Sequence, residues 1–233
     1  MVSLICCYNN LQQYEDMRKS LENQTVEYEM IGIDNREGKY KSAASALNAG
    51  VSKSHGEILI FLHQDIIFER ENSLEDFIKA IPNDKNSIVG LYGASHGKRR
   101  KIAENLYEAE TLDECCVVMH KTVWKQLKFN EDICNSWHLY VVELCLRAGG
   151  QGILIASGNF DIKHLSTGTV DEKYMKIFKD LLVIYKKKKW IATTCKVMPT
   201  NLFVFYLYYG IWKIKKMLFG NLPMAYQIKK LLW

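Results

Sequence analysis

The stretch SAASALNAGVSKSHGEILIFLHQDIIF, residues 42–68, decides the fold. Its first half has the pattern of a helix, and a tight turn separates it from the apolar run Ile58–Leu62. A continuous apolar run of this kind is typical of a strand that is buried on both faces of a sheet. The polar side chains of His63, Gln64 and Asp65 follow directly. In open α/β sheets ligands bind just beyond the carboxyl ends of the strands, so we expect a ligand site here.

Strands and helices alternate over the sixty or so residues that end at this point. We expect strands at 2–7, 28–33 and 57–62, with helices at 11–23 and 42–54 between them. This order indicates βαβ units and a parallel sheet. Two of the strands are followed by an acid, Asp34 and Asp65, and in a parallel sheet both acids lie at the same edge. A carboxylate there can hold a divalent cation, and the cation can hold a diphosphate.

The remaining sequence predicts further elements of the same domain. We expect helices at 73–80, 121–127, 139–148 and 171–187, and strands at 87–92, 114–119 and 152–156. The chain has only three prolines and no low-complexity linker. We therefore predict one α/β domain over residues 1–185, followed by a basic, aromatic tail over residues 186–233.

The cysteines indicate a reducing compartment. Their number, seven, is odd, and they form neither a CxxC pair nor the framework of a secreted disulfide protein. The chain opens at once as a strand, without the basic flank of a signal peptide. We therefore expect the domain to be cytoplasmic.

The charge of the tail differs from that of the domain. Residues 186–233 contain ten lysines and no acid, which leaves 21 basic and 26 acidic groups in residues 1–185. This distribution argues against a general nucleic-acid-binding surface and for a local contact with something anionic. The apolar run 202–212 is too short to span a bilayer but suits a helix lying on the inner face of the cell membrane. The alternative is an amphipathic helix packed on the domain or on a partner subunit.

Four segments resemble the family-2-type glycosyltransferases, in family order and over roughly the first 170 residues. They are VSLICCYNN from residue 2, SAASALNAGVSKSHGEILIFLHQDI from 42, FNE from 129 and ELCLRAGG from 143. Those enzymes have a GT-A fold, which is Rossmann-like. The resemblance therefore implies an α/β fold with a mainly parallel central sheet flanked by helices, here with a C-terminal helical tail.

The resemblance also implies a reaction and a set of site residues. It implies transfer of a sugar from a nucleotide-diphosphate donor, usually with Mg²⁺ or Mn²⁺. Asp34 would contact the nucleotide base, Asn48 would lie near the donor, and Asp65 would bind the metal. A late histidine completes the metal site in many GT-A enzymes, and His164 is placed for this. The other residues assigned to the donor site lie at strand ends in the matching segments: Cys7, Tyr8, His63 and Gln64.

The chain departs from the family pattern at two places. The usual Asp-x-Asp is His63-Gln64-Asp65 here, which resembles a variant carried by some bacterial capsule or O-antigen transferases. The usual Glu-Asp pair, which supplies the catalytic base, would fall on residues 140–141, where no acid stands. Transfer needs a group that takes the proton of the acceptor hydroxyl. The nearby candidates are Glu143, His138 and Asp113, although Glu143 could simply pair with Arg147 one helical turn further on.

These observations predict a metal-assisted, inverting glycosyltransferase that extends a lipid-linked bacterial surface glycan, peripherally bound at the membrane and able to form homo-oligomers. The alternative is a non-catalytic relative that binds a nucleotide or glycan and has lost part of the metal and base set. A nucleotidyltransferase would require a glycine-rich, basic phosphate loop, whereas residues 6–10 contain neither glycine nor lysine.

Overall fold

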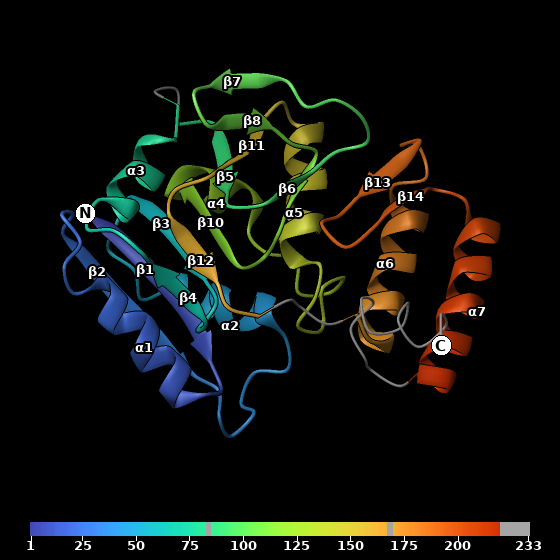
Figure 1. Cartoon of the computed structure of the whole chain (residues 1–233), viewed down its shortest axis with the longest axis horizontal. Coiled ribbons are helices and arrows are strands. Elements are labelled where there is room, and N and C mark those ends of the chain that lie inside the picture. Colours follow the sequence, from blue (N-terminus) through green and yellow to red (C-terminus); the bar gives the residue numbers. More distant parts are fainter. Residues whose placement is uncertain (83–84, 167–169, 220–233) are drawn as a thin grey trace, which may run out of the picture.

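An eight-stranded sheet forms the centre of the computed structural model, which describes residues 1–82, 85–166 and 170–219 (Figure 1). The strand order is β2-β1-β3-β10-β5-β11-β8-β7. The bounds are β1 Val2–Tyr8, β2 Tyr28–Asp34, β3 Ile58–Leu62, β5 Ser87–Gly90, β7 Lys101–Ala103, β8 Leu106–Glu108, β10 Cys116–His120 and β11 Leu154–Gly158.

The sheet is mainly parallel in direction, as predicted. Strands β2, β1 and β3 pair in parallel, and so do β5 and β11. Strand β10 is antiparallel to both of its neighbours, β3 and β5, and β8 is antiparallel to β11 and β7. Six of the eight strands therefore run the same way, and the ends of β1, β2 and β3 meet at one edge of the sheet.

Helices cover both faces of the sheet (Figure 1). Their bounds are α1 Leu11–Leu21, α2 Ala43–Val51, α3 Ser73–Lys79, α4 Lys121–Leu127, α5 Tyr140–Gly150, α6 Glu172–Ile184 and α7 Leu202–Phe219. Side-chain oxygens of Asn10, Ser42 and Asp171 accept backbone N–H groups at the starts of α1, α2 and α6. No described helix is both long enough and apolar enough to cross a membrane.

The side chains of β3 alternate between two cores. Leu59 and Phe61 belong to the core shared with α2, α4, α5 and α6, whereas Ile60 and Leu62 belong to the core shared with α1 and α3. Both faces of the strand are thus covered by apolar side chains. This is the physical reason for the continuous apolar run in the sequence.

Three short two-stranded ribbons complete the described chain. They pair β4 Ile66–Phe68 with β12 Ile162–His164, β6 Gly93–Ala94 with β9 Thr111–Leu112, and β13 Trp190–Ala192 with β14 Val197–Pro199. The β4–β12 ribbon places His164 opposite Ile66, the residue after Asp65. The ribbon therefore brings two candidate metal ligands, 99 positions apart in the chain, into contact.

Several predicted boundaries were wrong by a few residues. The strand predicted at 87–92 ends at Gly90, the one at 114–119 is β10, and the one at 152–156 is β11. The β7–β8 hairpin and the three ribbons were not predicted, because strands this short leave little pattern. Two predicted segments extend outside the described residues: HLSTGT from His164 at 167–169, and the tail at 220–233.

Candidate functional site

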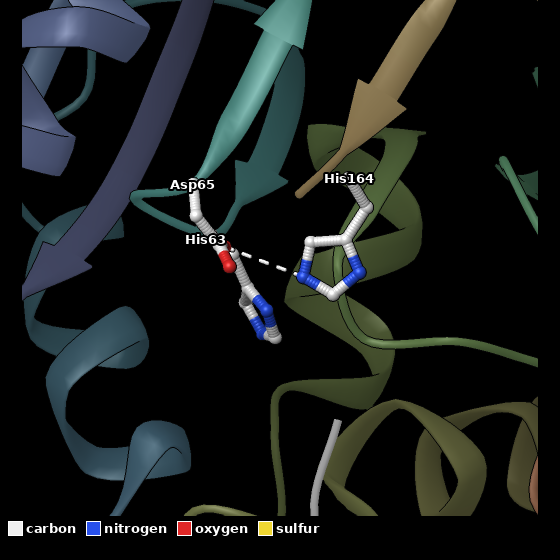
Figure 2. Close-up of side chains that lie close together, drawn as sticks. All are labelled: His63, Asp65 and His164. Atoms are coloured by element: carbon white, nitrogen blue, oxygen red, sulfur yellow. Dashed lines mark ion pairs between the residues drawn. The ribbon is translucent and has the colours of Figure 1, made fainter. Parts of the chain in front are cut away.

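Three side chains meet beyond the carboxyl end of β3 (Figure 2). His63 and Asp65 come from the turn after β3, and His164 comes from the end of β12. Asp65 Oδ1 lies 3.3 Å from His164 Nε2, and one ligand atom from each of the three residues lies within 4.8 Å of the others. One carboxylate and two imidazoles are a donor set that can hold a divalent transition-metal ion, Mn²⁺ among them.

The protonation of the cluster also fits a cation. Burial raises the pKa of Asp65, but hydrogen bonds from His164 and Ser166 outweigh it and lower this pKa to about 2, so the carboxylate is ionised at neutral pH. Burial and the neighbouring His164 lower the pKa of His63, which keeps that imidazole neutral. A metal ligand must be deprotonated, and both groups meet this condition.

Tyr140 determines which nitrogen of His63 is free. The Tyr140 hydroxyl donates to the Glu114 carbonyl at 3.3 Å and lies 3.1 Å from His63 Nε2. When the hydroxyl proton points to the carbonyl, His63 Nε2 carries a hydrogen and donates it to the hydroxyl oxygen. Nδ1 of His63 is then left with a lone pair, as a metal ligand requires.

A pocket of about 480 Å³ adjoins this cluster. His63 and His164 form part of its wall, together with Asp113 and His138 from the predicted set of proton acceptors. The other residues that line it are Tyr92, Leu112, Glu114, Trp137, Leu139, Val142, Ser166, Tyr174, Thr193, Thr194 and Cys195. The pocket can therefore place a substrate next to both the candidate metal ligands and two candidate bases.

The two candidate bases in the pocket have different partners. His138 Nε2 lies 3.2 Å from Asp171 Oδ1, and the same carboxylate oxygen caps α6. Asp113 accepts hydrogen bonds from the Cys115 backbone N–H and from the Thr194 hydroxyl. His138 is thus oriented by a carboxylate, an arrangement common for a general base.

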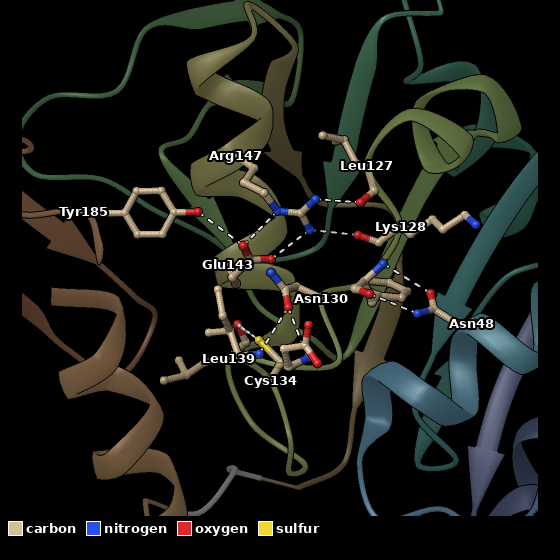
Figure 3. A network of polar contacts seen from close by, with 12 residues as sticks. Asn48, Leu127, Lys128, Asn130, Cys134, Leu139, Glu143, Arg147 and Tyr185 are labelled. Atoms are coloured by element: carbon tan, nitrogen blue, oxygen red, sulfur yellow. Dashed lines mark hydrogen bonds and ion pairs between the residues drawn. The ribbon is translucent and has the colours of Figure 1, made fainter. Parts of the chain in front are cut away.

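Glu143, the third candidate base, is not in the pocket. Its side chain is fully buried, and Arg147 donates to both carboxylate oxygens at 2.7 and 2.8 Å (Figure 3). The Tyr185 hydroxyl donates to Glu143 as well, at 3.2 Å. Arg147 also donates to the carbonyls of Leu127 and Lys128, so the pair holds α5 to the end of α4. Glu143 therefore forms the ion pair with Arg147 that was the alternative to a catalytic role.

Comparisons with known proteins agree with this geometry. Residues 3–116 match a family model described as a glycosyltransferase-like family. A mannosyltransferase from Pyrobaculum calidifontis, solved with GDP-Man and Mn²⁺, has a TM-score of 0.54 and 11% identity over 80% of this chain and 63% of its own. Residues 1–349 of S. aureus TarS, solved with UDP-GlcNAc, have a TM-score of 0.52 and 15% identity, over 78% of this chain and 65% of their own length.

The chain has the GT-A fold. GalNAc-T7, solved with UDP, GalNAc and Mn²⁺, adds a TM-score of 0.61 at 11% identity, over 78% of this chain and 47% of its own. The chain thus spans less than two thirds of the length of each of these three proteins. No curated protein matches the chain in sequence. The structural likeness shows a fold shared with GT-A glycosyltransferases, and the family model covers 114 of the 233 residues.

The donor was predicted to bind at the carboxyl ends of the parallel strands. Tyr8 and Asp34 lie there, as paired residues of β1 and β2. The Arg36 side chain donates to both oxygens of Asp34, and these bonds lower the pKa of Asp34 to about 2. Cys7 is half-buried, and burial followed by the charge of Asp34 raises its pKa to about 12. Its thiol is therefore uncharged at neutral pH, which argues against a role as a nucleophile.

Gln64 holds the loop between β1 and α1 in this GT-A domain. Its carbonyl oxygen accepts the backbone N–H groups of Asn9 and Asn10, at 2.8 and 2.9 Å. Its amide donates to the side chains of Asn9 and Gln13, at 3.0 Å each. Through these four hydrogen bonds Gln64 fixes the loop between β1 and α1 at the carboxyl ends of the strands.

Asn48 connects α2 to the FNE segment at 129–131 (Figure 3). Its amide donates to the Phe129 carbonyl and to Glu131, and its oxygen accepts the Phe129 N–H. These contacts account for the polar side chains of Asn48 and Glu131 at these positions. Both polar atoms of the Asn48 amide therefore bind the loop at 129–131 in this structure.

Glu114 lines the pocket but was not among the residues predicted from the sequence. The residue is half-buried with its Oε1 out of contact with solvent, and the carboxyl group accepts the backbone N–H groups of Leu139 and Tyr140 at the start of α5. Its Oε1 has no hydrogen-bond partner within the described residues. Burial, with the nearby charge of Asp113, raises the pKa of Glu114 well above its ordinary value of 4.5. The only signal in the sequence was an acid directly after Asp113.

Glu114→Gln is expected to stabilise the protein at neutral pH. Because the folded state keeps the proton on Glu114 above pH 4.5 and the unfolded state loses it, the free energy of unfolding falls as the pH rises. The slope is at most about 1.4 kcal/mol per pH unit. Glutamine is neutral and can still accept both backbone bonds, so it removes this slope. Urea denaturation of both proteins measures this slope across pH 5 to 8, roughly the range of maximal stability in most proteins. Identical slopes would show that Glu114 is ionised in the fold.

Proposed function

We propose that this protein transfers a sugar from a nucleotide-diphosphate donor to the hydroxyl of a glycan acceptor. The observation that carries the proposal is the cluster of His63, Asp65 and His164, which lies at the strand ends of a GT-A sheet and borders a pocket. The family match over residues 3–116 supports the same reaction class.

The residues that would hold a divalent cation are Asp65, through its carboxylate, and His63 and His164, through ring nitrogens. A bound Mn²⁺ or Mg²⁺ would supply positive charge against the diphosphate as it leaves, which stabilises the transition state more than the ground state. The set contains one carboxylate where the usual motif has two. The two imidazoles add nitrogen ligands, which favour a transition-metal ion such as Mn²⁺ over Mg²⁺.

We assign the role of general base to His138. With Nε2 hydrogen-bonded to Asp171, its Nδ1 is left to accept the proton of the acceptor hydroxyl. The hydroxyl oxygen then bonds to the anomeric carbon while the bond from that carbon to the diphosphate oxygen breaks, with inversion. Asp113, on the same pocket wall, is the second candidate.

The acceptor we propose is a lipid-linked surface glycan of a bacterium, reached from the cytoplasmic face of the membrane. The support is the position of the tail: Cys195 lines the pocket, and the next residue, Lys196, has its ammonium group 4.4 Å from the centre of the Tyr208 ring on α7. The pocket and α7 are thus neighbours, so a surface that holds α7 also holds the pocket near it.

Calorimetry with UDP-, GDP- and dTDP-linked sugars tests the function. We expect one donor to bind in the presence of Mn²⁺ and to bind at least about tenfold more weakly in EDTA, because the cation bridges protein and diphosphate. Binding that ignores the metal would assign His63 to the nucleotide directly. Failure of the folded protein to bind any donor would favour the non-catalytic alternative.

A further inference from the structure

One face of α7 is apolar and exposed. The side chains that form it are Phe203, Leu207, Ile211, Ile214, Met217 and Leu218. Phe203 is 77% exposed and Met217 is 78% exposed, values unusual for such side chains in a folded protein. At 100° per residue these positions share one side of the helix. We call this set the outer face of α7.

The opposite side of α7 packs on the domain. Phe205 is buried in the larger core, and Tyr208, Tyr209 and Trp212 pack against the same core. The spacings 205–208, 205–209, 208–212 and 209–212 are all three or four residues, so these side chains form one inner face of the helix. The exposure of the outer face is therefore a property of a docked helix, at the edge of the molecule away from α1 (Figure 1).

Lysines border the outer face. By helical geometry Lys213 lies along one margin and Lys215 along the other. The Lys213 ammonium is 4.6 Å from the Tyr209 ring centre, and that of Lys216 is 5.0 Å from the Trp212 ring centre. The sequence from 186 to 233 contains no acid, although the pKa of Lys213 is raised by Tyr209 and also by Glu172 of α6, which lies nearby. Lys216 and the two rings belong to the inner side of the helix, whereas Lys213 and Lys215 border the outer face. An apolar stripe between cationic margins matches the layers of a bilayer surface.

We propose that the outer face of α7 docks the protein onto a membrane surface rich in anionic lipid. The apolar side chains would enter the boundary between headgroups and acyl chains, and the lysines would contact the headgroup phosphates. The helix of 18 residues is about 27 Å long and would lie in the plane of the membrane. This inference is independent of the sugar-transfer reaction.

Charge favours a membrane over a second copy of the chain. A twofold contact through the outer face would bring the lysine margins of both copies together, without acids from the tail between them. Like charges across an interface oppose association. An anionic headgroup layer supplies the missing opposite charge.

Co-sedimentation of the full chain with vesicles tests the proposal. We expect binding to vesicles of phosphatidylcholine mixed with phosphatidylglycerol, and much weaker binding to phosphatidylcholine alone. Leu207→Glu and Ile214→Glu should each weaken binding about tenfold or more, since each removes an apolar group that the membrane would bury. Lys215→Gln should weaken it about fivefold.

The matched control is Leu11→Glu, which adds the same charge at a partly exposed apolar position on α1. It should bind vesicles like the wild type, and circular dichroism should show all variants folded. Equal binding by the α7 variants and the wild type would overturn the proposal. So would an absence of vesicle binding together with a dimer, seen by analytical ultracentrifugation, that the α7 variants dissociate. No donor is present in these assays, so their outcome does not depend on the transfer reaction.

Discussion

Asp65→Ala is expected to reduce sugar transfer by at least about a hundredfold and to remove the metal-dependent part of donor binding. Loss of a residue that merely supports a metal ligand already costs about ten- to a hundredfold, and Asp65 is the only carboxylate in the cluster. Without it only the two imidazoles remain, and an imidazole brings no negative charge to offset that of a divalent cation. Calorimetry with Mn²⁺ and with EDTA, beside steady-state rates, measures both effects.

Asp65→Asn separates charge from packing in this experiment. Asparagine keeps the size of the side chain and can still accept the hydrogen bonds from His164 and Ser166. It should lose metal-dependent binding nearly as far as alanine does. If both variants keep that binding, Asp65 is not a metal ligand and the cluster only holds β4 against β12.

His138→Gln is expected to lower kcat by about 10² to 10⁴, with donor affinity unchanged. Glutamine can still donate to Asp171, so the start of α6 stays held, but it cannot take the acceptor proton. Rates at saturating substrate, compared with calorimetric donor affinity, separate the two effects. His55→Gln is the control, because that imidazole is exposed and paired with Glu29 outside the pocket.

Other outcomes for His138 are informative. An equal loss of donor affinity would place His138 against the donor and not the acceptor. An unchanged kcat would transfer the role of base to Asp113, and Asp113→Asn should then show the loss.

Local patterns predicted the first half of the fold well. The alternation up to Leu62 fixed the order of β1, α1, β2, α2 and β3, and because these strands are parallel it also predicted that Asp34 and Asp65 lie at the same edge. The contact between Asp65 and His164 was suggested by family resemblance alone. It depends on the β4–β12 ribbon, which joins distant segments by main-chain pairing and leaves no periodic signal.

The pocket could be predicted only in part. Asp113 and His138 were identified as polar residues near a motif, and both line it. Glu143 shares their chemistry, but its helical spacing from Arg147 allowed an ion pair, and burial made that pair dominant. Glu114 could not be identified, since its burial depends on the folded structure and its backbone partner Leu139 lies 25 positions further along the chain.

The position of β10 has a consequence for synthesis on the ribosome. Strands β3 and β5 are made early, yet neither pairs with the other, because Cys116–His120 lies between them. Until that segment has left the exit tunnel, the nascent chain holds two apolar strands with open edges. Unpaired strand edges bind other chains readily. A ribosome that stalled before residue 116 would thus release a fragment prone to aggregate, whereas a later stop leaves the centre of the sheet closed.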